Sequence, residues 1–263
     1  MAAPRLSTAI DTGDLTLPDT GRLLVMRPAA GFDLSPLPRE RVHVVQGFRP
    51  DHDHFQAAGF ETGVAPEGRY AMALICLPRS KTHARALIAE AAALTDGALV
   101  IDGQKVDGVD SMLRELRRRA EVLAVVSQGH GKLIVVAGGA FPDWRPAEGE
   151  LPEGFITAPG MFSADGVDPA SALLAGALPR RLGKSVCDLG AGWGYLSRAV
   201  LDRTDVEDLH LVEAEHDALE AARRNISDPR AQFHWADATG FTQVDRFDAI
   251  VTNPPFHVGR RAD

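Results

Sequence analysis

A short run near the end of the chain has the residue types needed to bind an amino group through hydrogen bonds. The run is Asn253-Pro254-Pro255-Phe256. Two prolines fix the backbone and remove two N–H donors, so the carbonyls stay free to accept hydrogen bonds. The Asn253 side-chain oxygen and the Pro254 carbonyl can both accept from one NH₂ group, and Phe256 offers a flat face for a planar substrate. The simpler alternative is a turn that ends a strand.

A glycine-rich turn lies earlier in the chain, between a predicted strand and a predicted helix. Its residues are Asp188, Leu189, Gly190, Ala191, Gly192, Trp193 and Gly194. Glycines let the backbone turn sharply and let a ligand approach where a Cβ would otherwise stand. The spacing is G-x-G-x-G, which differs from the G-x-G-x-x-G of dinucleotide-binding proteins. The turn alone is compatible with either a tight strand–helix connection or a ligand site.

Two carboxylates follow the next two predicted strands. Glu213 lies 25 residues after Asp188 and can accept hydrogen bonds from both hydroxyls of a ribose. Glu215 is a competitor, but Glu213 is the first acid after its strand. Asp237 ends the following strand and can accept a hydrogen bond from an adenine amino group. Either carboxylate alone is compatible with a solvated surface, but together with the glycine-rich turn they predict contacts to one adenosine.

The motifs fall at the ends of successive predicted strands in the second half of the chain. Strands are predicted at the ranges 185–190, 208–214, 231–237 and 247–255, with amphipathic helices between the first three. This alternation predicts a parallel, doubly wound α/β sheet. We therefore assign residues 151–263 to a catalytic domain.

The first half predicts a second α/β domain, over residues 1–150. Strands are predicted at 42–48, 70–78 and 98–103, with Ser80 capping a following helix. A hairpin around Gly129-His130-Gly131 predicts an antiparallel edge. The first twenty residues are polar and are expected to be partly loose. The range 141–160 holds four prolines and is interpreted as an interdomain linker.

Composition limits the possible partners and locations. The net charge of −8 argues against a protein that depends on non-specific nucleic-acid affinity, so RNA would require a local patch. Arg260 and Arg261, beside the proline run, are the preferred candidates for phosphate contacts. The two cysteines have no metal-ligand spacing, so we expect no metal. No apolar run reaches the ~20 residues of a membrane span, and we expect a cytoplasmic protein.

The four motifs together resemble those of class I S-adenosylmethionine-dependent methyltransferases. More narrowly, the chain resembles the methyltransferase small domain family and its ribosomal RNA small subunit methyltransferase C group, from PGMFSADGVDPASALL at 159–174 and from TNPPFHVG. The resemblance implies methylation of guanine N2 in ribosomal RNA, with ribosomal RNA or a ribosomal subunit as partner and S-adenosylmethionine as cofactor. Implied target-amine positions are Asn253, Pro254, Pro255 and Phe256. Implied donor-binding positions are Asp188, Gly190, Ala191, Gly192, Gly194, Glu213 and Asp237.

The resemblance also extends to the first half, where YAMALICLPRSK is similar to the N-terminal domain of that group. It implies two tandem Rossmann-like domains, of which the first is degenerate and serves substrate docking or support. Leu77-Pro78-Arg79-Ser80 stands where an Asn-Pro-Pro would be needed, and no glycine-rich turn precedes it. Members of the group continue beyond the proline run, so the resemblance implies a catalytic domain truncated after its fourth strand.

Two alternatives stay open from the sequence. The same proline run suits N6 of adenine or the side-chain amide of a protein glutamine as acceptor, and the acidic charge leaves a protein substrate possible. A non-catalytic RNA-binding or ribosome-assembly module is the alternative from another class. Binding of the methyl donor would distinguish an enzyme from this module, since a non-catalytic module need not bind the donor.

Overall fold

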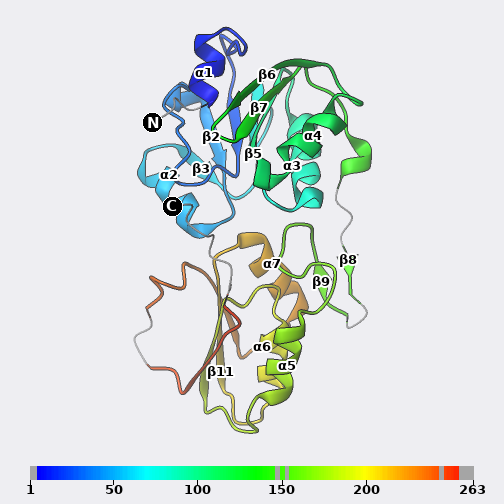
Figure 1. The fold of residues 1–263 in the computed structure, drawn as a ribbon. Helices are drawn as coiled ribbons and strands as arrows, with labels where there is room; N and C mark the ends of the chain where they lie inside the picture. The colour runs from blue at the N-terminus through cyan, green and yellow to red at the C-terminus, as the bar shows by residue number, and fades with distance from the viewer. Residues whose placement is uncertain (1–4, 146–148, 152–153, 243–245, 255–263) are drawn as a thin grey trace. The chain divides into compact units, whose positions relative to one another are not determined.

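The computed structural model describes residues 5–145, 149–151, 154–242 and 246–254. The chain divides into two compact units, Met1–Ala147 and Glu148–Asp263 (Figure 1). Each unit is built around its own β-sheet and its own apolar core.

The first unit contains a mixed seven-stranded sheet in the order β3-β2-β1-β4-β5-β7-β6. Strands β1 to β5 are parallel, whereas β7 is antiparallel to both β5 and β6, so the predicted antiparallel edge is confirmed. The strands are β1 (Leu23–Met26), β2 (Val42–Val45), β3 (Glu61–Gly63), β4 (Met72–Cys76), β5 (Leu99–Gln104), β6 (Val122–Gln128) and β7 (Gly131–Val136).

Helices cover both faces of this sheet because its strands alternate their apolar side chains. On β1, Leu24 and Met26 belong to the core that α3 and α4 complete, whereas Leu23 and Val25 belong to the core with α1 and α2. The helices are α1 (Arg5–Asp11), α2 (Arg49–Ala57), α3 (Lys81–Leu94) and α4 (Val109–Leu116). The Ser80 hydroxyl accepts a hydrogen bond from the His83 amide, which confirms the predicted cap.

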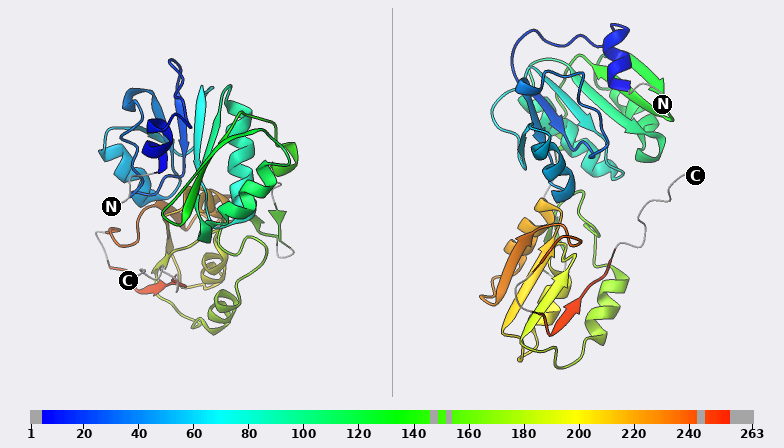
Figure 2. Two further views of the ribbon diagram at one scale, coloured as in Figure 1. Left: turned by 45° about the horizontal axis from the view of Figure 1, so that its top comes forward. Right: turned by 90° about the vertical axis from the view of Figure 1, so that its left-hand side faces the viewer.

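The second unit contains a parallel four-stranded sheet in the order β12-β11-β10-β13, as the alternation in the sequence predicts. Its apolar core lies between the sheet and helices α5, α6 and α7, which Figures 1 and 2 show beside the strands. The strands are β10 (Ser185–Leu189), β11 (Asp208–Glu213), β12 (Ala231–Trp235) and β13 (Ala249–Val251). The helices are α5 (Pro169–Ala177), α6 (Tyr195–Leu201) and α7 (His216–Asn225). A short pair, β8 (Gly149–Glu150) and β9 (Ile156–Thr157), precedes them.

Two expectations from the sequence have different outcomes. The polar N-terminal segment, which was expected to be partly loose, contains α1, because Leu6 and Ala9 are buried against the first sheet and anchor it. The division between the two units lies after Ala147, inside the predicted linker range 141–160, and aromatic residues on either side of this division enter the two cores. Trp144 packs against the core of the first unit, and Phe155 packs against Trp193 in the second.

Candidate active site

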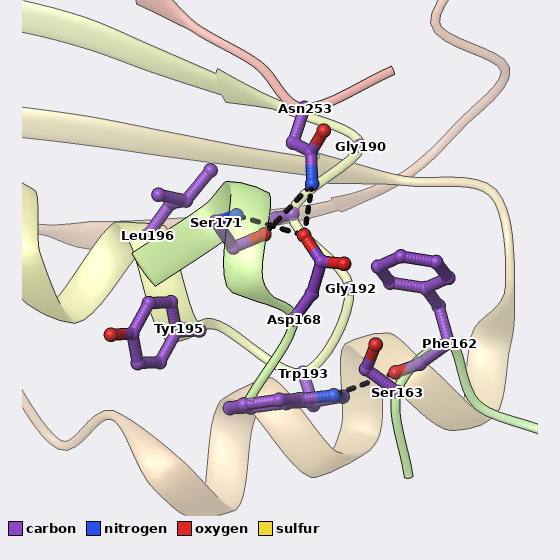
Figure 3. Close-up of a pocket in the computed structure, with 11 residues that line it drawn as sticks. Phe162, Ser163, Asp168, Ser171, Gly190, Gly192, Trp193, Tyr195, Leu196 and Asn253 are labelled. Atoms are coloured by element: carbon purple, nitrogen blue, oxygen red, sulfur yellow. Dashed lines mark hydrogen bonds between the residues drawn. The ribbon is translucent and has the colours of Figure 1, made fainter. Parts of the chain in front are cut away.

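Several segments of the second unit meet in one pocket at the carboxyl ends of β10 and β13. The chain leaves β10 toward β11 on one side and returns in β13 on the other, which is the switch point where open α/β sheets bind ligands. The pocket brings Gly190, Ala191 and Gly192 of the glycine-rich turn next to Asn253 (Figure 3). The remaining lining comes from the 162–171 segment and the start of α6.

The glycines of the turn have positive φ angles, a backbone conformation that residues with a Cβ rarely adopt. Gly190, Gly192 and Gly194 have φ angles of 77°, 56° and 93°. Among the described residues, a Cβ at Gly190 or Gly192 would have no non-neighbouring protein atom within 4 Å, so a ligand can approach the backbone there. A Cβ at Gly194 would lie 2.8 Å from the Ile226 side chain, so this glycine serves close packing instead.

Side-chain hydrogen bonds hold the turn in place. The Asn225 amide at the end of α7 donates to the Trp193 carbonyl at 2.8 Å and to the Ile156 carbonyl at 3.0 Å. The Trp193 indole in turn donates to the Phe162 carbonyl at 2.9 Å (Figure 3). The ligand-facing backbone is therefore anchored to α7, to β9 and to the 162–171 segment.

Glu213 lies at the end of β11 and already contacts the glycine-rich turn. Its two carboxylate oxygens accept hydrogen bonds from the Gly192 and Glu215 amides, both at 2.8 Å. Burial raises the pKa of Glu213, and these amides partly offset that effect. Because a carboxylate oxygen has more than one lone pair, both oxygens can also accept hydroxyl donors. Glu213 is thus suited to hold a ribose beside Gly192.

Asp188 is placed differently from its predicted role as a ligand contact. Its side chain is fully buried below the turn, where Oδ2 accepts a hydrogen bond from the Ser197 hydroxyl of α6 at 2.6 Å. The other oxygen, Oδ1, is buried without a hydrogen-bond partner among the described residues. Burial raises the pKa of Asp188 to about 7, a direction that nearby Glu213 reinforces. A charged Asp188 is therefore costly in the free protein.

We expect Asp188 to make the stability of the second unit depend on pH. Because its folded pKa of about 7 exceeds the ordinary value of 3.8, the stabilising contribution is complete below about pH 4 and is lost as the pH rises through 7. The loss approaches about 4 kcal/mol for a shift of this size. Asp188→Asn should remove this dependence, so its advantage over the wild type should be larger at pH 8 than at pH 5. Denaturant titrations followed at NMR signals of β10 and α6 measure it, and equal pH dependence in both proteins would contradict the assignment.

Asn253 is held by two residues that the sequence analysis did not single out. Its Nδ2 donates to Asp168 Oδ2 at 2.9 Å and to Ser171 Oγ at 2.8 Å (Figure 3). Both partners lie at the start of α5, more than 80 residues away in the chain. The side-chain oxygen Oδ1 points away from these two partners, as Figure 3 shows. The Asp168-Pro169 pair does signal a helix start, but nothing in the sequence connects it to Asn253.

The other predicted residues have different outcomes. Asp237 follows β12 and lies outside the pocket lining, and its carboxylate accepts the Thr239 amide at 2.8 Å. Pro254 follows Asn253 and is exposed. Pro255, Phe256, Arg260 and Arg261 lie outside the described residues.

The described part of the site suits a nucleoside-containing ligand. Open backbone at Gly190 and Gly192 leaves room for it, and the Glu213 carboxylate can accept hydroxyl donors at the next strand end. The Asn253 amide then lies across the same pocket from the turn. Among the described residues, no group of three or more His, Cys, Asp or Glu side chains is arranged to bind a metal ion. Nor does the described part of the chain contain a helix with the length and apolar character of a membrane span.

Comparison with known proteins agrees with this geometry. Residues 153–263 match the family model of the methyltransferase small domain. The fold and the site together are those of a methyltransferase of the α/β Rossmann-like type, and residues 153–263 are similar to the methyltransferase small domain.

Within that class the chain is similar to ribosomal RNA small subunit methyltransferase C. It is 31% identical to the protein of that name from Pseudomonas aeruginosa over 213 residues, which are 76% of this chain and 64% of the relative. The Alteromonas mediterranea protein is 27% identical and is covered to 68%, with 90% of this chain aligned. The first two curated relatives are covered to 64% and 66%, so the chain spans just under two thirds of their length.

A solved structure shows the same likeness at the level of the fold. It is the T. thermophilus 16S rRNA N2 G1207 methyltransferase in complex with AdoMet and guanosine, and it is 28% identical. The TM-score is 0.77, and the match covers 94% of this chain and 73% of the other.

Proposed function

We propose that this protein transfers a methyl group from S-adenosylmethionine to the N2 amino group of a guanine in ribosomal RNA. The observation that carries the proposal is the Asn253 amide, which is held through its nitrogen in the pocket that Gly190 and Gly192 also line. The names of the relatives and the guanosine and AdoMet in the similar solved structure support the choice of guanine N2 and of this donor.

The chain's own residues have three tasks in this reaction. The donor supplies a methyl group that its sulfonium centre already activates. Gly190 and Gly192 leave space for the donor, and Glu213 accepts hydrogen bonds from its ribose. Asn253 Oδ1 and the Pro254 carbonyl accept hydrogen bonds from the target NH₂ and orient its nitrogen toward the methyl group. The nitrogen would form a bond to the methyl group as the S–CH₃ bond of the donor breaks and leaves a neutral thioether, and the nitrogen would release one proton to solvent.

The target base has to leave its stack to reach such a pocket, and unstacking is the usual route to chemistry on a base. Phe256 and the basic pair Arg260 and Arg261 remain proposed contacts for the base and for phosphate. If that pair binds phosphate, RNA affinity should fall steeply with salt.

We also propose that residues 1–150 form a degenerate copy of the catalytic domain, which we assign to residues 151–263. The strand order β3-β2-β1-β4 repeats as β12-β11-β10-β13. At the end of the central strand, the Arg27 amide donates to the Val45 carbonyl at 2.8 Å, as the Gly190 amide donates to the Val212 carbonyl. Arg27, with φ 54°, therefore corresponds to the first glycine of the turn.

Further corresponding positions support the loss of donor binding in the first unit. Gln46 corresponds to Glu213, and each accepts the amide two residues ahead, from Phe48 at 3.0 Å and from Glu215 at 2.8 Å. A glutamine in place of the carboxylate is a poorer acceptor for ribose hydroxyls. We infer a supporting or RNA-docking role for this unit.

The registers of β4 and β13 complete the correspondence at the target-amine position. Val25 pairs with Leu74 in the first sheet, and Asp188 pairs with Val251 in the second. Leu74 therefore corresponds to Val251. Two residues beyond this pair, Cys76 corresponds to Asn253. The motif alignment in the sequence analysis placed Leu77, one residue later, at this position. A thiol offers no amide oxygen for an NH₂ group.

Nucleoside analysis tests the proposal. After incubation of the protein with labelled donor and small-subunit ribosomal RNA, we expect labelled N2-methylguanosine. Labelled N6-methyladenosine, or label in glutamine of a ribosomal protein, would instead identify the alternative acceptors. Absence of donor binding in calorimetry would favour a non-catalytic RNA-binding module and would overturn the proposal.

A further inference from the structure

The contacts of the Asn253 amide define how its two ends are oriented. An amide NH₂ group has two hydrogens, and here one reaches Asp168 Oδ2 and the other Ser171 Oγ. The Nδ2 end is thereby fully used, and Oδ1 is turned away from both partners (Figure 3). A hydroxyl such as that of Ser171 can donate or accept, so it tolerates either orientation of the amide. A carboxylate only accepts, so Asp168 repels the flipped orientation.

We propose that Asp168 and Ser171 are positioning residues that orient Asn253 so that Oδ1 can accept a hydrogen bond from the target amine. This proposal rests on the proposed function. Neither residue needs to contact the substrate. Asp168 supplies the orientation, and Ser171 supplies the second acceptor that completes it.

The start of α5 holds Asp168 in this position. Asp168 is the N-cap of α5, and its Oδ2 accepts the Ser171 amide at 2.8 Å as well as the Asn253 amide. The bond from the Ser171 amide is the main cause that lowers the pKa of Asp168, so the carboxylate stays charged at neutral pH. A charged acceptor also polarises the Asn253 amide and makes Oδ1 a better acceptor. Asp168 therefore both caps α5 and orients the Asn253 side chain, which follows β13.

Two substitutions at Asp168 separate orientation from helix capping. In Asp168→Ser the hydroxyl keeps the cap but is too short to reach Asn253, so we expect at least a tenfold loss of kcat. Asp168→Asn is the matched control, because its side-chain oxygen can accept both the Ser171 and the Asn253 hydrogens. It should retain activity within a few fold. Both variants should keep the donor Kd and the thermal midpoint of the wild type.

A double-mutant cycle tests whether Asp168 acts through Asn253. In an Asn253→Ala background, Asp168→Ser should cause no further loss of kcat, because the group that it orients is gone. A role in folding or RNA binding would persist in that background, so an undiminished loss there would overturn the proposal.

An NMR measurement keeps this proposal separate from the proposed function. In the wild type, the two Nδ2 protons of Asn253 should exchange slowly with solvent, and Asp168→Ser combined with Ser171→Ala should abolish this protection. The measurement needs neither donor nor RNA. If the wild type methylates no RNA, the proposed function fails while this result stands. Unchanged protection in the double variant would overturn the positioning role.

Discussion

Asn253→Ala is expected to lower kcat for methyl transfer by about 10²- to 10³-fold, the usual effect of removing one preorganised hydrogen-bonding group from an active site. The donor Kd should stay within about twofold, because Asn253 contacts the target amine in the proposed arrangement rather than the donor. The pocket should also survive, since the substitution removes only the amide that Asp168 and Ser171 hold. Single-turnover transfer and calorimetry with donor measure the two quantities separately.

Asn253→Asp is the companion variant for this result. It keeps an oxygen where Oδ1 stands but places a second carboxylate against Asp168, so charge repulsion should displace the side chain. We expect a loss of kcat comparable to that of Asn253→Ala. A parallel loss of donor affinity and transfer in the alanine variant would rule out the target-amine role for Asn253.

Glu213→Gln is expected to raise the donor Kd by about 100-fold, which corresponds to the loss of charge-assisted hydrogen bonds to two ribose hydroxyls. The substitution also turns one oxygen into an NH₂ group that must face the amide of either Gly192 or Glu215. If it faces Gly192, the glycine-rich turn loses one of its contacts to β11. At saturating donor, kcat should change by only a few fold, because the target-amine contacts are intact.

Glu215→Gln provides the matched control for this effect. Glu215 is the neighbouring carboxylate, and its backbone amide donates a hydrogen bond to Glu213. Its substitution should leave the donor Kd within about twofold. The opposite pattern, with weak binding only in the Glu215 variant, would transfer the ribose-binding role to Glu215.

Part of the first unit could not be predicted from the sequence. Helix α2 is mostly polar and buries only His52 and Phe55, so its periodicity is weak. Strand β1 has four residues, all buried, in a segment whose short apolar run does not distinguish a strand from a helix. Trp144 lies in a proline-rich segment typical of a linker, yet it packs on the first core. In each case the tertiary contacts outweigh the local signal.

The site divides in the same way between local and tertiary information. The residue types and spacing determined the glycine-rich turn and Asn253, because each works through local backbone geometry at a strand end. The sequence does not predict that Asp188 is buried against Ser197, because the packing of α6 decides which face of the strand it meets.

The sequence by itself determined the order of strands and helices in the second unit, the resemblance to the methyltransferase small domain and the side chains available for chemistry. Only the tertiary structure decided that Asp168 and Ser171 hold Asn253 and that Asp188 lies below the turn. The physical reason is that hydrophobic periodicity and turn residues encode local structure over a few residues. A hydrogen bond between residues more than 80 positions apart exists only after α5 and β13 have packed on one sheet.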